Sequence, residues 1–254
     1  MIHPTAIVSP KAKLGSNVNV GPFAIIDDDV IIGDNCTISP RCHIEYAEIG
    51  SNNYFGDGAM IGAAPQDLKY RNEHSLVRIG DNNVIREYVS VHRATHEGEA
   101  TTIGNNCFIM VMSHIAHDCK IGNKVIMVNN VGMAGHVIVE DGAFISGYAL
   151  LHQFTRIGSY VMLGGGTKVN KDIPPYVMAN GEDAVIHGLN KVGLKRNGFP
   201  PETIKLLEEV YSIFFREKLL FKDALAKIGT LLPQTKEVKH FVDFVRASKR
   251  GIER

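Results

Sequence analysis

Aliphatic residues recur every six positions through the first two-thirds of the chain. The series begins at Ile2, slips by one position before Ile49, and runs without a miss from Ile103 to Val169. This period matches neither the helical repeat of about 3.6 residues nor the alternation of an amphipathic strand. It indicates a triangular coil in which three short strands, eighteen residues in all, complete one circuit.

In such a coil the aliphatic side chains point into a prism, and stacked circuits pair their backbones about 4.8 Å apart. Each circuit buries its apolar residues only against its neighbours, so many circuits are needed for stability. We therefore predict a mainly β protein, with a left-handed parallel β-helix of hexapeptide repeats over residues 1–187.

Three positions that fall in phase carry carboxylates instead, namely Asp67, Glu73 and Glu97. An unpaired carboxylate inside a dry prism is strongly unfavourable. We therefore expect the surrounding segments, at about 62–78 and 92–102, to leave the coil as loops. Such excursions from a regular scaffold commonly carry binding residues.

The pattern changes after Val169, where we expect the segment Asp172-Ile173-Pro174-Pro175 to break the coil. From Pro201 onward the apolar residues take helical spacing, and further helices are expected over 221–230 and 234–249. These features predict a small C-terminal helical domain, over 188–254, that caps one end of the prism. The apolar face of its first long helix consists of Ile204, Leu207, Val210, Tyr211 and Phe214.

Charge is distributed unevenly although the formal net charge is zero, a balance that argues against a nucleic-acid binder. Residues 1–187 carry 13 Lys/Arg against 19 Asp/Glu, a net of −6, and residues 188–254 carry 14 against 8, a net of +6. A basic segment on an acidic body indicates an anionic partner or substrate, and mutual attraction of the two parts is the alternative.

The four cysteines form no CxxC pair, and no apolar stretch approaches the ~18 residues of a membrane span. The N-terminus lacks the charged and apolar regions of a signal peptide. We therefore expect reduced thiols and a cytoplasmic protein without a transmembrane segment.

Histidines cluster where the coil brings circuits together. With eighteen residues per circuit, one column of positions about 5 Å apart reads His117, Gly135 and Gln153. His136 and His152 lie one residue from that column, and His114 lies in a column nearby. Three histidines are therefore expected to converge on an edge where Gly135 exposes its backbone. This pattern favours a functional site over a stack of surface histidines.

Asp118 directly follows His117. A carboxylate beside an imidazole can fix its tautomer and raise its basicity. Neighbouring residues on a strand point to opposite faces, but at a corner of the coil they need not. A catalytic dyad and a capped turn therefore both remain open for Asp118.

Several motifs together resemble the UDP-N-acetylglucosamine O-acyltransferases, the lipid A acyltransferase family, over the whole chain. They are QDLKY at 66–70, VHR at 91–93, SHIAHDC at 113–119, AGHV at 134–137, HQF at 152–154, DIPPY at 172–176, Gly188-Leu189-Asn190, and GLKR at 193–196. A single hexapeptide repeat is unspecific, whereas this combination is highly specific.

The resemblance implies transfer of a 3-hydroxyacyl group from acyl carrier protein to the 3-hydroxyl of UDP-N-acetylglucosamine, the first step of lipid A synthesis. It implies no cofactor, no metal and no covalent acyl-enzyme. His117 would be the general base, and Asp118 would orient its imidazole. The Gly135 N–H would form the oxyanion hole, a donor typically worth about 3 kcal/mol of barrier.

The resemblance also implies binding roles and an assembly. Asp67 and Lys69 would hold the sugar; His114, His136 and His152 would line the cleft; Gln153, Asn190 and Arg196 would contact the nucleotide side. Arg196 suits phosphate as a fork of donors, with a solvated surface charge as the alternative. The family is a homotrimer with its sites in clefts between coils, so the basic cap could meet the acidic carrier protein.

Two details bear on specificity. Gly165 occupies the position at which the family measures acyl length, and a glycine there favours a longer chain unless it merely serves a coil corner. Val192 stands where many members carry glutamate, and some relatives use a 3-amino sugar to form an amide. Both acceptors therefore remain open.

A different class with the same coil is the γ-type carbonic anhydrase, in which three histidines bind zinc. His114, His117 and His136 could superficially serve, but the QDLKY loop and the helical cap argue against this class.

Overall fold

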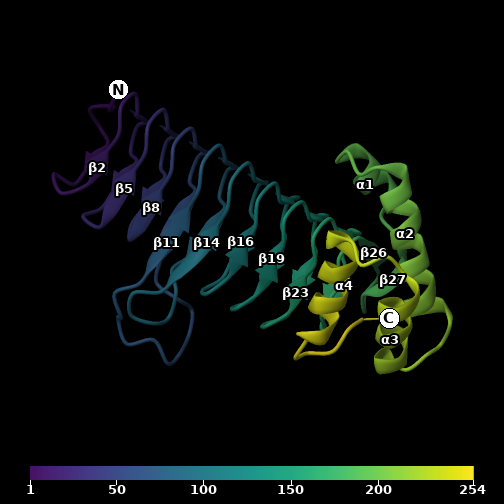
Figure 1. The fold of residues 1–254 in the computed structure, drawn as a ribbon. Coiled ribbons are helices and arrows are strands. Elements are labelled where there is room, and N and C mark those ends of the chain that lie inside the picture. The colour runs from purple at the N-terminus through teal and green to yellow at the C-terminus, as the bar shows by residue number, and fades with distance from the viewer. Residues whose placement is uncertain (254) are drawn as a thin grey trace.

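The computed structural model describes residues 1–253. A long coil of short strands runs from the N-terminus to a cluster of helices at the other end, as Figure 1 shows. Three sheets form the sides of the coil; through β25 all their strands are parallel and each sheet takes every third strand of the chain. The predicted β-helix with a helical C-terminus is thereby confirmed.

The strands of the three sheets have the following bounds. Sheet 1 contains β1 (Ile7–Val8), β4 (Ile25–Ile26), β7 (His43–Ile44), β10 (Met60–Ala63), β13 (Ser90–His92), β16 (His114–Ile115), β19 (Gly132–Met133), β22 (Leu150–Leu151) and β25 (Lys168–Val169). Sheet 2 contains β2 (Lys13–Leu14), β5 (Val30–Ile32), β8 (Ala47–Ile49), β11 (Leu76–Ile79), β14 (Ala100–Ile103), β17 (Lys120–Ile121), β20 (Ile138–Val139) and β23 (Arg156–Ile157). Sheet 3 contains β3 (Asn19–Val20), β6 (Thr37–Ile38), β9 (Tyr54–Phe55), β12 (Val84–Ile85), β15 (Phe108–Ile109), β18 (Ile126–Met127), β21 (Phe144–Ile145), β24 (Met162–Leu163), β26 (Val177–Asn180) and β27 (Val185–Leu189).

The register confirms a circuit of eighteen residues in the regular part of the coil. Ile115 pairs with Met133, and Met133 pairs with Leu151. These side chains are buried in the prism, as the six-residue period requires. A column of core residues therefore fixes which surface residues lie above one another.

The chain turns the corners of the prism through residues with left-handed backbone. At the corner between sheets 2 and 3, these are mostly asparagines; we call it the asparagine corner, and it includes Asn17, Asn35, Asn52, Asn82 and Asn106, with φ between 57° and 59°. At the corner between sheets 1 and 2, three consecutive circuits place Asp118 (φ 61°), His136 (61°) and Phe154 (66°); we call it the histidine corner.

Two loops interrupt the coil, as the misplaced carboxylates predict. The first joins β10 to β11 over residues 64–75, and the second joins β13 to β14 over residues 93–99. Both are shorter than expected because the strands β11 and β14 begin before the aliphatic residue that marks the period. Both loops hang from the same side of the coil in Figure 1.

The prediction that the coil breaks after Val169 is wrong. Ile173 forms a parallel bridge with Ile157, and β26 pairs in parallel with β24 before β27 closes the sheet in the antiparallel sense. Pro174 and Pro175 lie in the turn between these pairings, where a proline deprives no strand of a donor. The irregular spacing of the buried residues hides this last circuit from a search for six-residue repeats.

The helical part consists of α1 (Lys191–Arg196), α2 (Pro201–Tyr211), the π-helix η1 (Ser212–Arg216), α3 (Phe221–Leu231) and α4 (Lys236–Arg246). The helices expected near 201, 221 and 234 are present, whereas α1 was not predicted. Their shared core includes Leu207, Phe214 and Phe241. Helix α4 contacts the coil, where His240 Nε2 lies 2.8 Å from Glu140 Oε2.

Among residues 1–253, no helix is long and apolar enough to cross a membrane. The four cysteines are free and buried, in agreement with the expected reduced thiols. Burial raises the pKa of the Cys119 thiol to about 12, which leaves it unreactive.

Candidate functional site

A groove of about 730 Å³ runs along sheet 1 beside the first loop. One wall comes from the loop residues Gln66, Asp67, Leu68 and Lys69. The floor and the other wall come from the coil, through His114, Ala116, His117, Gly132, Met133, Ala134, Gly135, Leu150, Leu151 and Gln153. Six of the residues singled out in the sequence therefore line one concave surface: Asp67, Lys69, His114, His117, Gly135 and Gln153.

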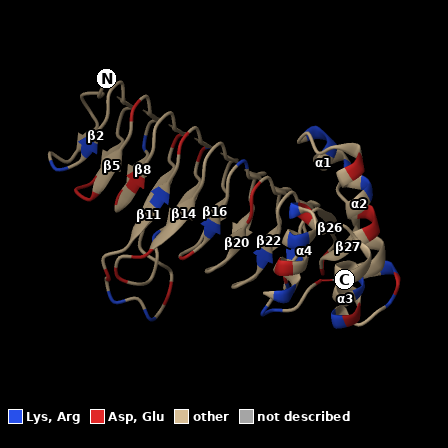
Figure 2. Ribbon diagram, in the orientation of Figure 1, with Lys and Arg blue, Asp and Glu red and all other residues tan. Residues whose placement is uncertain are grey.

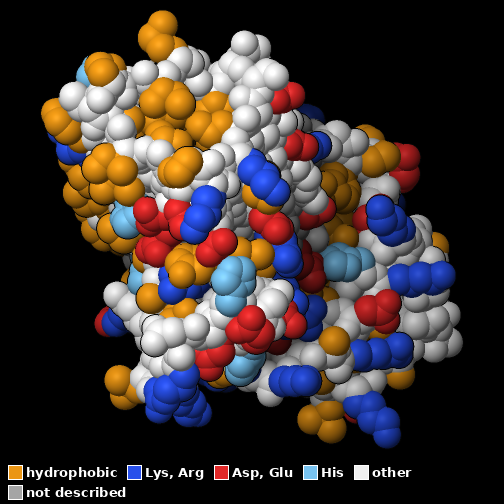
Figure 3. Space-filling view, turned by 90° about the vertical axis from the view of Figure 1, so that its left-hand side faces the viewer, with side chains coloured by type: hydrophobic (Ala, Val, Ile, Leu, Met, Phe, Trp, Pro, Cys, Tyr) orange, Lys and Arg blue, Asp and Glu red, His pale blue; other side chains and the backbone are white. Residues whose placement is uncertain are grey.

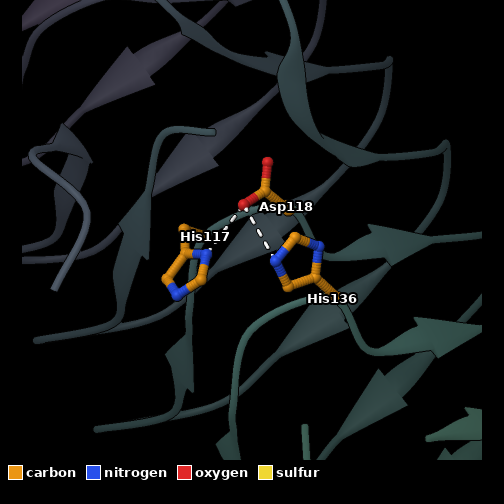
Figure 4. Close-up of side chains that lie close together, drawn as sticks. All are labelled: His117, Asp118 and His136. Atoms are coloured by element: carbon orange, nitrogen blue, oxygen red, sulfur yellow. Dashed lines mark hydrogen bonds and ion pairs between the residues drawn. The ribbon is translucent and has the colours of Figure 1, made fainter. Parts of the chain in front are cut away.

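His117 lines this groove and is only 6% exposed. Its Nδ1 lies 2.7 Å from Asp118 Oδ2, as Figure 4 shows. The left-handed backbone at Asp118 turns the carboxylate back toward the preceding ring, which an extended strand would not allow. Because Nδ1 donates to the carboxylate, the Nε2 lone pair is left to accept a proton from a ligand.

Asp118 is itself held by the second loop and the coil. Thr95 donates to its carboxylate from the backbone N (3.1 Å) and from Oγ1 (2.8 Å). Its own N–H donates to Thr101 Oγ1 at 2.8 Å. Burial alone would raise the pKa of Asp118, but the hydrogen bonds from His117 and Thr95 outweigh it and bring the pKa to about 2. The group is thus both an ionised hydrogen-bond partner of His117 and a turn residue.

Gly135 lies one circuit beyond His117 and leaves room for its ring. A Cβ at this position would overlap the imidazole, and it would lie 2.7 Å from Nε2. The coil pairs Ala134 N with Leu151 O and His136 N with His117 O, both at 3.0 Å. The Gly135 N–H, which lies between them, has no hydrogen-bond partner within residues 1–253. A free donor thus lies beside the imidazole, as an oxyanion hole requires.

His114 and His92 extend the cluster along sheet 1. Ser90 Oγ lies 2.8 Å from His114 Nδ1, and the His92 ring meets the His114 ring edge-on at 5.0 Å. His92 is buried, and its Nδ1 has no hydrogen-bond partner in the described part of the chain. Burial, together with the neighbouring His114 and His117, lowers the pKa of His92 to about 4. A neutral imidazole pair therefore continues the site.

The other two histidines of the predicted edge behave differently. The His136 ring meets the His117 ring at 5.3 Å, and its Nε2 lies 3.5 Å from Asp118 Oδ2. It also stacks on Phe154 at 4.6 Å. His152 is exposed, and its Nδ1 lies 3.2 Å from the Gln153 carbonyl oxygen. The structure thus brings His136 to the dyad, but neither His136 nor His152 lines the groove as expected.

Of the three residues expected on the nucleotide side, Gln153 lines the groove, whereas Asn190 and Arg196 lie at α1 in the helical part. Asn190 begins α1, where its Oδ1 accepts from Gly193 N at 3.0 Å and its Nδ2 donates to Tyr160 O at 2.8 Å. Its side chain therefore serves a helix cap within this chain. Arg196 is exposed in the last turn of α1. Neither residue lines the groove beside His117.

Gly165 lies at the corner that follows β24 and is exposed. A Cβ there would have Gly147 O as its nearest neighbour, at an ordinary contact distance of 3.5 Å. A larger residue could therefore occupy this position, and glycine keeps the space open. Its role as an acyl ruler stays a prediction.

Within residues 1–253, His117, Asp118 and His136 form the one group whose donor atoms lie close enough together, within 4.8 Å, to hold a metal ion. This set contains His117 and His136 but not His114, so it is not the three-histidine set of the carbonic anhydrase alternative. The 2.7 Å contact between His117 and Asp118 is a hydrogen-bond distance, which favours a dyad over two ligands of one ion.

Sequence reasoning overlooked two contributors to the site. Thr95 belongs to the second loop, and nothing in the repeat foretells that it returns to Asp118. His92 could have been predicted to lie near His114. It ends β13, the strand of sheet 1 that pairs with β16, and His114 begins β16. Because the second loop adds residues between these two strands, a search at a spacing of eighteen does not pair them.

Comparison with known proteins gives a consistent picture. Residues 172–253 match the family model "Udp N-acetylglucosamine O-acyltransferase; Domain 2", and the segments 11–46, 29–63 and 100–135 match the model for bacterial transferase hexapeptide repeats. The acyl-[acyl-carrier-protein]–UDP-N-acetylglucosamine O-acyltransferase of Thermodesulfovibrio yellowstonii is 51% identical over 99% of this chain and 98% of its own. The protein of that name from Alkalilimnicola ehrlichii is 42% identical over 100% of this chain and 99% of its own.

Solved structures agree over the whole length. The UDP-N-acetylglucosamine acyltransferase of Bacteroides fragilis has a TM-score of 0.97 and 46% identity, with both chains covered completely. That of Francisella novicida has a TM-score of 0.96 and 40% identity, covering 100% of this chain and 94% of its own.

Proposed function

The chain belongs to the UDP-N-acetylglucosamine O-acyltransferase family, and we propose that it transfers a 3-hydroxyacyl group from acyl carrier protein to the 3-hydroxyl of UDP-N-acetylglucosamine, the first step of lipid A synthesis. The observation that carries the proposal is the hydrogen-bonded His117–Asp118 pair beside the free N–H of Gly135, with His117 and Gly135 both lining the groove. Base and donor are the two groups that attack of a hydroxyl on a thioester requires.

In the proposed reaction, the sugar hydroxyl gives its proton to His117 Nε2 as its oxygen attacks the thioester carbon. The Gly135 N–H donates to the oxyanion that develops there. The C–S bond then breaks, and the proton on His117 passes to the departing thiolate. Asp118 stays ionised and holds the imidazole in the tautomer with a free Nε2.

The first loop supplies the acceptor side of this proposal. Asp67 and Lys69 line the groove opposite His117, so their charged groups can bind the hydroxyls of a sugar. His114 and Gln153 line the same surface, and His136 contacts the dyad. His152, Asn190 and Arg196 lie outside the groove of their own chain. They can contact the substrate only if it extends beyond this groove, or if they face the groove of a neighbouring chain.

We further propose a homotrimer in which a neighbouring coil closes the open side of the groove. The apolar surface of the N-terminal circuits supports it: Ile7 is 66% exposed and Phe23 64%, and Figure 3 shows hydrophobic side chains gathered over this part of the coil. A neighbour's α1 could then bring Arg196 to the diphosphate. Sedimentation should give three times the chain mass, and a monomer with full activity would contradict the assembly.

The exposed basic residues of α4 support a docking site for the acidic carrier protein. Lys236, Lys239 and Arg246 are exposed on α4, and Asp243 is exposed among them; Figure 2 shows blue bands along this helix with red between them. Transfer should therefore weaken as salt is raised, with the effect on the KM for the carrier protein.

The decisive experiment offers purified protein acyl carrier protein thioesters of several lengths together with UDP-N-acetylglucosamine or its 3-amino analogue. We expect an ester at the 3-position and a preference for longer acyl chains, which Gly165→Met should shift toward shorter ones. Amide formation alone would replace the proposed acceptor by the amino sugar. Absence of transfer to either acceptor would refute the proposed function.

A further inference from the structure

One buried arginine lies between the coil and the first loop without touching the groove. The Arg93 side chain is 9% exposed and starts the second loop directly after β13. A buried guanidinium is unfavourable unless its donors and its charge find partners. Its partners therefore indicate what the fold gains by placing an arginine there.

On the coil side, Arg93 contacts the point where the chain leaves sheet 1. Its Nη1 donates to Gly62 O at 2.6 Å, and its Cζ lies 4.1 Å from the centre of the Tyr46 ring. Glu45 Oε2 lies 3.5 Å from Nη1. Gly62 has φ 91°, and a Cβ there would overlap the Glu45 carbonyl oxygen, so only glycine fits where the chain leaves the sheet.

On the loop side, Arg93 contacts Tyr70. Its Nε donates to the Tyr70 hydroxyl at 3.1 Å, and this hydroxyl donates to Glu73 O at 2.9 Å. Tyr70 also closes a turn that begins at Asp67, because Tyr70 N donates to Asp67 O at 3.1 Å and Lys69 N donates to Asp67 Oδ1 at 2.7 Å. The position of Tyr70 thus sets the position of the turn that lines the groove.

We propose that Arg93 is a positioning residue for the acceptor sugar: it fixes the turn 67–70 against the coil so that Asp67 and Lys69 face the groove. The guanidinium suits this task because its rigid fork reaches the coil and the loop at once. Lysine carries one flexible point charge and can hold only one side. The expected effect on kinetics rests on the proposed function, whereas the contact between Arg93 and Tyr70 does not.

The kinetic test compares Arg93→Met with Arg78→Met. Arg78 is half exposed on sheet 2, where it pairs with Glu48 at 2.7 Å, so its replacement is a matched control away from the groove. Arg93→Met should raise the KM for UDP-N-acetylglucosamine by about 10-fold or more, with kcat within about threefold and the KM for the acyl donor unchanged. Arg93→Lys should recover part of the loss. A fall in kcat at unchanged KM would overturn the proposal.

A second readout needs no activity. Trypsin can cleave after Lys69 and Arg71, both exposed in the first loop. Released from Arg93, this loop should be cut several-fold faster in Arg93→Met than in Arg78→Met, and equal rates would overturn the proposal. If the wild type transfers no acyl group, the proposed function fails while this readout still decides the role of Arg93.

Tyr70→Phe is a milder variant that keeps the proposal testable if Arg93→Met does not fold. It removes only the hydroxyl between Arg93 and Glu73, so the same KM should rise by a smaller factor. In the double variant, Tyr70→Phe should add almost nothing to the effect of Arg93→Met, because both act through one contact. Independent, multiplying effects, or no effect of Tyr70→Phe, would contradict the proposed path.

Discussion

The asparagine corner and the histidine corner share one backbone conformation but use their side chains differently. Along the asparagine corner, side chains bond within their own column: Asn17 Nδ2 donates to Asn35 Oδ1 at 3.1 Å, and Asn35 Nδ2 donates to Asn52 Oδ1 at 3.3 Å. At the histidine corner, Asp118 instead bonds His117 and the loop residue Thr95. The turn is the same, and the partners decide whether it stabilises the coil or holds a reactive group.

The residue types reflect this division. Asparagine and aspartate adopt left-handed backbone more readily than other non-glycine residues, which suits a repeated structural turn. Histidine is also enriched in this region, whereas bulkier residues such as Phe154 are not. Phe23 and Tyr148, at the corner between sheets 3 and 1, adopt the same conformation. The repeat thus provides the turn geometry, and the residues placed at the turn and their partners provide the chemistry.

The largest difference between the two corners should appear in catalysis when His117 is replaced. We expect His117→Ala to lower kcat by about 10²–10⁴-fold, because it removes the proton acceptor. Circular dichroism and sedimentation should remain those of the wild type, since the register of the coil does not depend on this side chain. Near-normal turnover would refute the assignment of His117 as the base.

Gly135→Ala should have the next largest effect, a loss of about 10³-fold in kcat/KM. The added methyl overlaps the His117 ring and must displace either the imidazole or the Gly135 N–H. Gly229→Ala, in the last turn of α3 where a Cβ meets open space, is the matched control and should leave activity unchanged. An active Gly135→Ala enzyme would show that the stacking has no catalytic role.

Acid should destabilise the histidine side of the molecule through His92. Its folded-state pKa of about 4 lies below the ordinary value of 6.5, so the unfolded chain binds more protons between these pH values. Stability should therefore fall as pH drops from 6.5 to 4, by on the order of 3 kcal/mol from this group. Urea unfolding of His92→Gln should show a correspondingly shallower pH dependence, and an identical slope would contradict the inference.

A change at the asparagine corner should have the smallest effect. Asn106 is exposed with φ 58°, and alanine tolerates this conformation less well. We expect Asn106→Ala to cost about 1 kcal/mol in unfolding free energy with turnover unchanged. A large loss of activity would show that the two corners are not independent.

The regular part of the coil could be predicted because its period is local to the sequence. Counting by eighteen correctly placed His117 beside Gly135 and brought His136 to the same edge. The count also suggested His152, which is in the right circuit but turns to the outside. A period fixes the position of a residue along the coil more firmly than the direction of its side chain at a corner.

The parts that could not be predicted depend on segments outside the repeat. Thr95 and Arg93 reach Asp118 and Tyr70 from a loop whose path no periodicity describes. The circuit through Ile173 was missed because its buried residues depart from the six-residue spacing. Asn190 caps α1, a helix too short to show an apolar period.

The most direct test of the difference between the corners is whether Asp118 acts only through His117. In a double-mutant cycle of His117→Ala and Asp118→Asn, kcat/KM should fall steeply in each single variant. Once His117 is absent, adding Asp118→Asn should cost less than about twofold more, since residues that act as a unit are not additive. Losses that multiply in the double variant would contradict the dyad and, with it, the proposed role of the histidine corner.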